Sequence, residues 1–157
     1  MSSFRICCLQ LELTTADNFD LIAKEVRYAK MLFPKLDMVA FGELATWGLD
    51  STKAETLPGP TETKYYELAR ELGIWLIPGS LYEKSGDLIH NAASVIDPDG
   101  RGVTLYRKMF PWMPFESKTT PGEDFVVFDI PGQGRIGLSI CYDNSFPEVA
   151  RGLAPRP

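Results

Sequence analysis

The segment Arg135-Ile-Gly-Leu-Ser-Ile-Cys141-Tyr-Asp-Asn-Ser-Phe-Pro147-Glu-Val-Ala-Arg151 shows how this chain passes from strand to helix. The apolar run 136–140 predicts a buried strand, and Pro147 suits the first turn of a helix. Cys141 therefore lies on the sharp turn between the two elements. A side chain there projects from rigid backbone, and nearby backbone N–H groups can stabilise a developing oxyanion. This makes Cys141 the first candidate nucleophile.

The same alternation of strand and helix is predicted in the first half of the chain. Apolar runs predict strands at 4–13, 37–41 and 74–80. Between them, amphipathic patterns predict a helix from about Asp17 to Phe33, and a second helix capped by Thr61 and closed by Gly73. Two consecutive strand–helix–strand units imply parallel strands.

Two hairpins are predicted further along the chain. Residues 89–96 and 102–106 flank the turn sequence Asp97-Pro-Asp-Gly100, and residues 125–130 and 135–140 flank Pro131-Gly-Gln-Gly134. These hairpins add antiparallel strands, so the fold class is α/β with a mixed sheet and helices on one face. The strands read as continuous apolar runs, which indicates that the other face is apolar as well.

Composition indicates a single domain, 1–157, of a soluble globular protein. Hydrophobic residues make up 45% and charged residues 24% of the chain. The net charge of −5 argues against nucleic acid and anionic membrane as partners, because both require clustered Lys and Arg. The sequence shows neither an apolar stretch of transmembrane length nor the pattern of a signal peptide, and we expect neither. We therefore expect a cytoplasmic location.

The cysteines and the single histidine offer few alternatives to Cys141. The three cysteines include the adjacent pair Cys7 and Cys8, and they suggest neither a disulfide framework nor a zinc site. Cys7 and Cys8 lie in an apolar strand pattern, so we expect small buried hydrophobes. His90 lies in another strand pattern without an acidic neighbour, and we expect it to be structural.

Three charged residues stand at strand ends or in a loop. Glu43 ends an apolar strand, Lys108 ends another, and Glu116 follows in the loop 109–124. Each alone could be a charge solvated at a strand end. A catalytic thiol, however, needs a base or a positive field, and a carboxylate at the end of a buried strand needs a partner. Together with Cys141, these residues suggest one site.

Two neighbours of these residues are expected to be structural. Strand alternation points Arg107 away from the face that carries Lys108. Asp143 could cap the helix that starts near Phe146.

Three segments resemble the signature segments of the nitrilase superfamily, the carbon–nitrogen hydrolases. They are Gly42-Glu43, Tyr106-Arg-Lys108 and Ile140-Cys141-Tyr-Asp-Asn-Ser-Phe-Pro-Glu148. The segment His90-Asn-Ala-Ala-Ser-Val-Ile-Asp-Pro-Asp-Gly100 is similar to the hairpin before the family's lysine. The resemblance extends from about Phe4 to Ala154.

This resemblance implies a role for each charged residue. Glu43 would be the general base, Lys108 the cation that stabilises the oxyanion, and Cys141 the nucleophile. Glu116 is similar to the second glutamate of the amidase-like members, which positions substrate and the attacking water. The implied reaction is hydrolysis of an amide, carbamoyl or nitrile carbon–nitrogen bond through a cysteine thioester, with release of ammonia and without a metal or an organic cofactor.

The resemblance also implies residues that contact the small-molecule substrate. The backbone N–H of Tyr142 would help to bind the oxyanion. Trp112 and Phe115 would line the substrate pocket, although a loop that packs its own small core explains these two aromatic residues equally well.

The family fold is a four-layer α-β-β-α sandwich of two similar halves, and this chain resembles the first half plus the helix after the nucleophile. We therefore expect a partial sandwich without the C-terminal half, with Pro155-Arg-Pro157 ending the last helix and with one sheet face and at least one edge exposed. Such a chain could be a homo-oligomer or could pair with a completing chain. Two alternatives remain: an inactive truncated homologue that acts as an interaction partner of full-length chains, and a protein with a redox-sensitive thiol.

Overall fold

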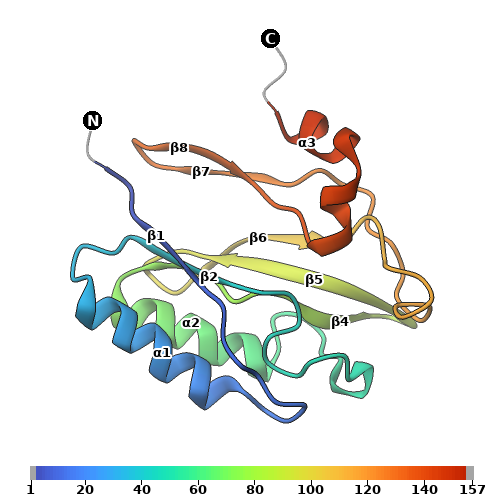
Figure 1. Ribbon diagram of the computed structural model, residues 1–157, viewed down its shortest axis with the longest axis horizontal. Coiled ribbons are helices and arrows are strands. Elements are labelled where there is room, and N and C mark those ends of the chain that lie inside the picture. The colour runs from blue at the N-terminus through green and yellow to red at the C-terminus, as the bar shows by residue number, and fades with distance from the viewer. Residues whose placement is uncertain (1–2, 155–157) are drawn as a thin grey trace.

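The computed structural model describes residues 3–154, which alternate between strands and helices (Figure 1). The elements are β1 (Ile6–Leu9), α1 (Phe19–Leu32), β2 (Met38–Phe41), the 3-10 helix η1 (Ser51–Lys53), α2 (Pro60–Leu72), β3 (Trp75–Ile77), β4 (Leu81–Ser85), β5 (Leu88–Ile96), β6 (Gly102–Arg107), β7 (Val127–Ile130), β8 (Gly134–Gly137), the 3-10 helix η2 (Cys141–Ser145) and α3 (Pro147–Leu153). The predicted helix stop at 155–157 lies outside the described residues.

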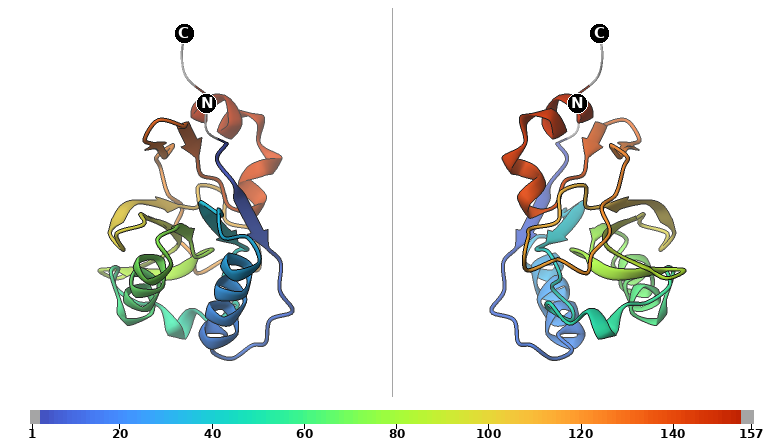
Figure 2. Two further views of the ribbon diagram at one scale, coloured as in Figure 1. Left: turned by 90° about the vertical axis from the view of Figure 1, so that its left-hand side faces the viewer. Right: turned by 90° about the vertical axis from the view of Figure 1, so that its right-hand side faces the viewer.

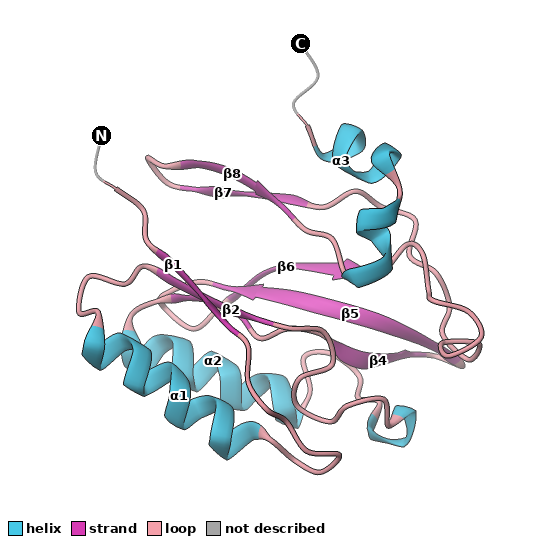
Figure 3. Ribbon diagram, in the orientation of Figure 1, coloured by secondary structure: helices cyan, strands magenta, loops and turns pink. Residues whose placement is uncertain are grey.

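Within residues 3–154, strands β1 to β6 form one mixed sheet, and β7 and β8 form a separate pair. β1, β2 and β3 are parallel, and β5 is antiparallel to β3, β4 and β6. The helices α1 and α2 cover one face of this sheet, and the β7–β8 hairpin with α3 lies over the other face (Figures 2 and 3). The α/β class, the mixed sheet and both predicted hairpins are confirmed.

The first core lies between the sheet and the two helices. Ile22, Val26 and Ala29 of α1 pack with Leu68 of α2 and with Leu76 of β3. The spacing of the α1 residues is the predicted apolar stripe of an amphipathic helix. Phe33, the predicted end of this helix, is exposed, and the helix ends one residue earlier.

The second core lies between the sheet and the β7–β8 hairpin. Met38, Val95 and Tyr106 of the sheet pack against Phe128 and Ile140. These three sheet residues are fully buried, so the hairpin covers this part of the second face. The expectation of an open sheet face is wrong here, because the segment after the long loop folds back over the sheet.

β1 forms an edge of the sheet, since it pairs with β2 alone among the described strands. Cys8 is exposed and Cys7 is half-buried. The prediction that both cysteines are buried is therefore wrong, because it assumed a longer strand inside the sheet. Strand β1 covers only four residues of the predicted 4–13.

β4 was not predicted, because its sequence includes the charged residues Glu83 and Lys84. Glu83 is nevertheless buried, since Arg107 of β6 donates two hydrogen bonds to its carboxylate at 2.6 and 2.7 Å. The strand predicted at 74–80 ends at Ile77, and the chain turns at Gly79 into the β4–β5 hairpin.

The predicted cap of α2 is also wrong. The helix starts with Pro60 in its first turn and has Gly59 as N-cap residue. The hydroxyl of Thr61 instead donates a hydrogen bond to Glu55, in the loop before the helix.

Gly79 and Gly86 provide a matched test of how closely the sheet backbone packs next to Glu43. Both have a positive φ, 69° and 62°. A Cβ on Gly79 would lie 2.0 Å from the carbonyl oxygen of Gly42, whereas a Cβ on Gly86 would meet no atom within 4 Å. Because of the left-handed backbone, we expect Gly86→Ala to cost about 1–2 kcal/mol of unfolding free energy. Gly79→Ala should cost about 1–3 kcal/mol more, because it also overpacks the backbone.

Urea unfolding of the two variants measures this difference. Equal losses in the two variants would show that the close approach of Gly79 to Gly42 is not a constraint on the fold.

Candidate active site

Glu43 follows β2 at the end of the sheet, in a turn with strained backbone. The next residue, Leu44, has a φ of 50°, a left-handed conformation that is unusual for a residue with a side chain. The N–H of Leu44 donates to the hydroxyl of Ser80 at 3.0 Å, and Leu44 is buried. These contacts hold the turn and thereby direct the Glu43 carboxylate. Strain of this kind is typical of functional sites.

Lys108 follows β6 directly, and its side chain is only 1% exposed. Its Nζ donates to Glu43 at 2.7 Å and to Glu116 at 2.5 Å. A buried ammonium is tolerated only when it is paired and hydrogen-bonded. The two strand ends and the loop thus meet around one cation, as the sequence predicted.

Glu116 is buried in the loop 109–124, where three donors surround its carboxylate. In addition to Lys108, the Nδ2 of Asn91 donates at 2.9 Å and the backbone N–H of Trp112 donates at 2.7 Å. This carboxylate therefore fixes the loop to the strand ends of the sheet.

Cys141 occupies the predicted turn, and its backbone has a φ of 47°. Its thiol lies close enough to the Glu43 carboxylate, the Lys108 ammonium and the backbone N–H of Tyr142 for all three to act on its pKa. The structure therefore brings together Glu43, Lys108, Glu116 and Cys141 from four separate segments.

Asp143 has a different role from the predicted helix cap. It is fully buried, and its carboxylate accepts hydrogen bonds from the Tyr106 hydroxyl at 2.6 Å and from the backbone N–H groups of Phe110 and Ile140, both at 2.9 Å. It thereby ties the Cys141 turn to the segment that carries Lys108. The rings of Phe110 and Phe146 are stacked with their centroids 3.9 Å apart, which also joins the Lys108 segment to the Cys141 turn.

Asn91 was missed by the sequence analysis, although it lies at the centre of the cluster. Its Nδ2 donates to both Glu43 and Glu116. The sequence signal that could have found it is strand alternation, which places Asn91 on the face of its strand opposite to His90. In the structure, the backbone N–H of Lys108 donates to the carbonyl oxygen of Asn91 at 2.8 Å.

The charges of the cluster shift the pKa values of its members. Burial raises the pKa of the Cys141 thiol, and the hydrogen bond and charge of Glu43 raise it further. Burial alone would lower the pKa of Lys108, but Glu116 and Glu43 together raise it. Burial alone would raise the pKa of Glu116, but its hydrogen bonds to Lys108, Asn91 and Trp112 lower it. In this resting arrangement the lysine is charged and the thiol holds its proton.

The aromatic residues expected to contact substrate lie near the surface. Trp112 and Phe115 are exposed, and the centroids of their rings are 4.6 Å apart. The ring of Tyr142 is partly exposed and packs edge-on against the ring of Phe146, with the two ring centroids 5.2 Å apart. That these rings line a substrate pocket stays a prediction.

His90 and Arg107 lie outside the cluster. The Nδ1 of His90 is 2.9 Å from the carbonyl oxygen of Thr120, and Arg107 pairs with Glu83. Residues 3–154 include no group of three or more His, Cys, Asp or Glu side chains that could hold a metal ion. None of the helices described is long and apolar enough to cross a membrane.

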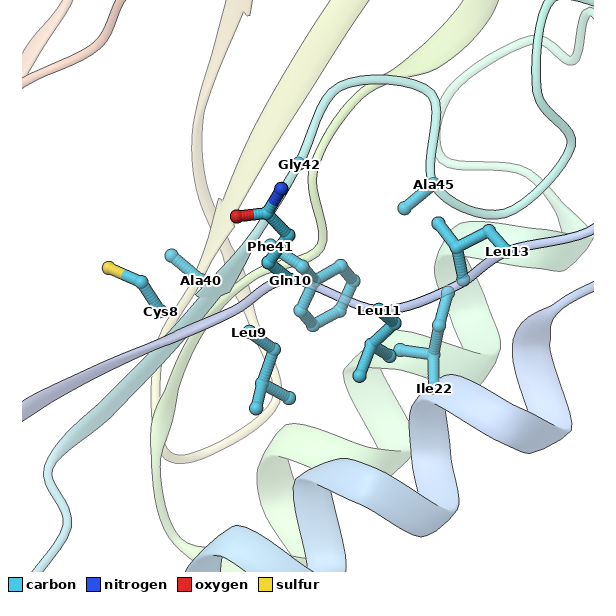
Figure 4. A pocket seen from close by; sticks show the side chains of 10 residues that line it. All are labelled: Cys8, Leu9, Gln10, Leu11, Leu13, Ile22, Ala40, Phe41, Gly42 and Ala45. Atoms are coloured by element: carbon cyan, nitrogen blue, oxygen red, sulfur yellow. The ribbon is translucent and has the colours of Figure 1, made fainter.

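A separate, mainly apolar pocket lies beside β1 and β2 (Figure 4). Its lining includes Cys8, Phe41 and Gly42, but neither Lys108 nor Cys141. The pocket therefore borders the turn that carries Glu43 without forming part of the cluster.

The charge of Glu43 next to Cys141 can be tested by thiol alkylation. We expect Glu43→Gln to move the pH midpoint of Cys141 alkylation by iodoacetamide to lower pH, because the variant removes a negative charge that opposes the thiolate. Peptide mass spectrometry follows Cys141, with the exposed Cys8 of the same chain as internal control. Glu12→Gln, which changes an exposed glutamate, is the matched control. An unchanged midpoint in Glu43→Gln would mean that Glu43 does not act on the thiol.

Comparison with known proteins shows close relatives in sequence. A family model described as carbon–nitrogen hydrolase matches residues 5–156. A formamidase of Bacillus cereus (strain B4264) is 34% identical over 141 residues, which cover 85% of this chain and 42% of that protein. A formamidase of Bacillus thuringiensis (strain Al Hakam) is 33% identical over the same length. The chain thus spans less than half the length of these curated relatives.

Solved structures show the same fold. Saccharomyces cerevisiae Nit3, a member of the nitrilase superfamily, is 24% identical with a TM-score of 0.83, and the match covers 94% of this chain and 58% of that chain. An amidase from Nesterenkonia sp. is 24% identical with a TM-score of 0.83, over 95% of this chain and 59% of that chain. The expected partial nitrilase fold is confirmed. The chain belongs to the carbon–nitrogen hydrolase family.

Proposed function

We propose that the cluster hydrolyses the carbon–nitrogen bond of small amides through a thioester at Cys141, with release of ammonia. The observation that carries this proposal is the position of Glu43, whose carboxylate accepts a hydrogen bond from the Lys108 ammonium at 2.7 Å and is near enough to the Cys141 thiol to raise its pKa. A base, a nucleophile and a cation thereby lie close together, as covalent acyl transfer requires.

The first half of the reaction forms the acyl-enzyme. Glu43 accepts the thiol proton as the sulfur attacks the carbonyl carbon. The oxyanion is stabilised by Lys108 and by the backbone N–H of Tyr142. When the intermediate collapses, the carbon–nitrogen bond breaks and Glu43 returns the proton to the departing nitrogen, which leaves as ammonia.

The second half of the reaction regenerates the thiol. Glu43 takes a proton from water, and the hydroxide attacks the thioester carbon. The carbon–sulfur bond then breaks, the carboxylic acid leaves, and the sulfur regains its proton from Glu43. Glu116, held by Lys108 and Asn91, positions the substrate and the attacking water. Trp112, Phe115 and the ring of Tyr142 form the walls around the substrate.

Relatives favour amides over nitriles as the substrate class. Two of the relatives in sequence are formamidases. The Nesterenkonia amidase has been solved in complex with butyramide, and also with the acetamide moiety of fluoroacetamide added covalently at its active-site cysteine. These observations support a small primary amide and a covalent step at a cysteine for this chain.

We also propose a cytoplasmic location. All three cysteines are free, including the exposed Cys8 and Cys141, which favours a reducing compartment.

The test offers formamide, acetamide, butyramide and acetonitrile to the purified chain and measures ammonia release. Intact-mass spectrometry detects the acyl adduct at Cys141. We expect Cys141→Ala to abolish both signals, because the variant has no sulfur to attack the amide carbon or to carry the acyl group. Cys8→Ala removes an exposed thiol outside the cluster and should leave both signals unchanged.

Two results would contradict the proposal. Ammonia release by Cys141→Ala at the rate of the starting protein would exclude the nucleophile. A well-folded chain that neither releases ammonia nor forms an adduct with any of these compounds would exclude the activity for this chain.

A further inference from the structure

Asn91 lies at the centre of the cluster, yet the reaction described above gives it no proton to carry. Its side chain is 0% exposed. Its Nδ2 donates to Oε1 of Glu43 at 2.7 Å and to Oε1 of Glu116 at 2.9 Å. One amide nitrogen thus bridges two carboxylates that come from a turn after β2 and from the loop 109–124.

The amide of Asn91 can face the carboxylates in one orientation only. In the flipped orientation the amide oxygen would face the two carboxylate oxygens. All three oxygens are hydrogen-bond acceptors, so no hydrogen bond could form between them. In the observed orientation, the amide oxygen Oδ1 is buried and has no hydrogen-bond partner among the described residues. A buried polar atom without a partner is unfavourable. The observed orientation therefore gives both carboxylates a hydrogen-bond donor but leaves the amide oxygen of Asn91 without one within residues 3–154.

Asn91 and Lys108 both donate hydrogen bonds to these two carboxylates. Lys108 donates to the same two glutamates, at Oε1 of Glu43 and at Oε2 of Glu116. An ammonium has three N–H groups, so two of them face the glutamates and one remains for a substrate oxyanion. A neutral second donor compensates part of the carboxylate charge without adding another cation. The backbone carbonyl of Asn91 also accepts from the N–H of Lys108, which fixes the two residues relative to each other.

We propose that Asn91 is a positioning residue that holds Glu43 and Glu116 on either side of Lys108 and keeps Glu43 available as a base for Cys141. This inference rests on the proposed function for its catalytic consequence, although its effect on the thiol does not require turnover.

Two substitutions separate hydrogen-bond donation from the filling of space. Asn91→Asp preserves the shape of the side chain but replaces the donor with a third carboxyl group. Asn91→Ala removes the side chain and leaves room for water. If Asn91 only fills space, the aspartate variant should resemble the starting protein more than the alanine variant does. If Asn91 acts as a donor, the aspartate variant should be at least as impaired.

We expect Asn91→Ala to lower kcat for amide hydrolysis about 100-fold, as displacement of catalytic groups by about 1 Å does. KM should change little, because Asn91 is buried behind the carboxylates. Asn91→Asp should lower kcat at least as much. It should also move the acidic limb of the kcat/KM profile to higher pH, because like charges at close range increase the affinity of the cluster for protons.

Ser94→Ala is the matched control. Ser94 is a buried polar residue of the same strand, β5, and its hydroxyl donates to Glu62 of α2 on the opposite face of the sheet. This variant should leave kcat and the pH profile unchanged, whatever it does to stability. Should Asn91→Asp fail to fold, Asn91→Ser provides the comparison, because its hydroxyl can still donate to one carboxylate and its kcat should fall between those of the starting protein and Asn91→Ala.

The pH profile of Cys141 alkylation decides the inference independently of turnover. A starting protein that hydrolyses none of the amides would contradict the proposed function, whereas a lower alkylation midpoint in Asn91→Ala, which adds no charge and releases Glu43 from its position near the thiol, would still support the role of Asn91. Conversely, an active starting protein together with a folded Asn91→Asp variant of unchanged kcat and unchanged alkylation midpoint would overturn the inference about Asn91 alone.

Discussion

The buried ammonium of Lys108 is the charge on which the arrangement of the site depends. A cation that is 1% exposed would be very unfavourable without partners, because burial removes its hydration. Glu43 and Glu116 provide these partners. Each carboxylate in turn needs further donors, which are Asn91 and the backbone N–H of Trp112. One buried charge thus determines the positions of a turn, a central strand and a long loop.

A second anchor connects the nucleophile to this arrangement. Asp143 accepts a hydrogen bond from Tyr106, two residues before Lys108, and also bonds the backbone N–H of Phe110, two residues after it. Through Ile140 the same carboxylate holds the residue directly before Cys141. The distance between the thiol and the cation is therefore set by a carboxylate that takes no part in the proposed chemistry. The left-handed backbone at Cys141 and Leu44 is maintained because such contacts surround it.

The sequence predicted those elements and residues that can be recognised from their immediate neighbours in the chain. Glu43 and Lys108 stood out because a charge directly after an apolar run is conspicuous, and Cys141 because Pro147 marks the following helix. Asn91 was missed because an asparagine inside a strand resembles any polar residue on a pleated surface. Its importance comes from contacts with Glu43 and Glu116, residues 48 and 25 positions away in the chain. β4 was missed for a similar reason, since only the distant Arg107 explains how Glu83 is buried. The exposure of Cys8 depends on the place of β1 in the sheet, which no local pattern encodes.

The contacts that close the site have a consequence for how the chain folds. The pairs Lys108–Glu43, Asn91–Glu43 and Tyr106–Asp143 join residues 65, 48 and 37 positions apart. Chain entropy opposes contacts of such separation until the intervening strands have formed, so proteins rich in them fold slowly. We therefore expect the ion pair to form only once β2, β5 and β6 have aligned. Without that alignment Cys141 has neither its carboxylate nor its cation, so the chemistry depends on completion of the whole sheet rather than on any single segment.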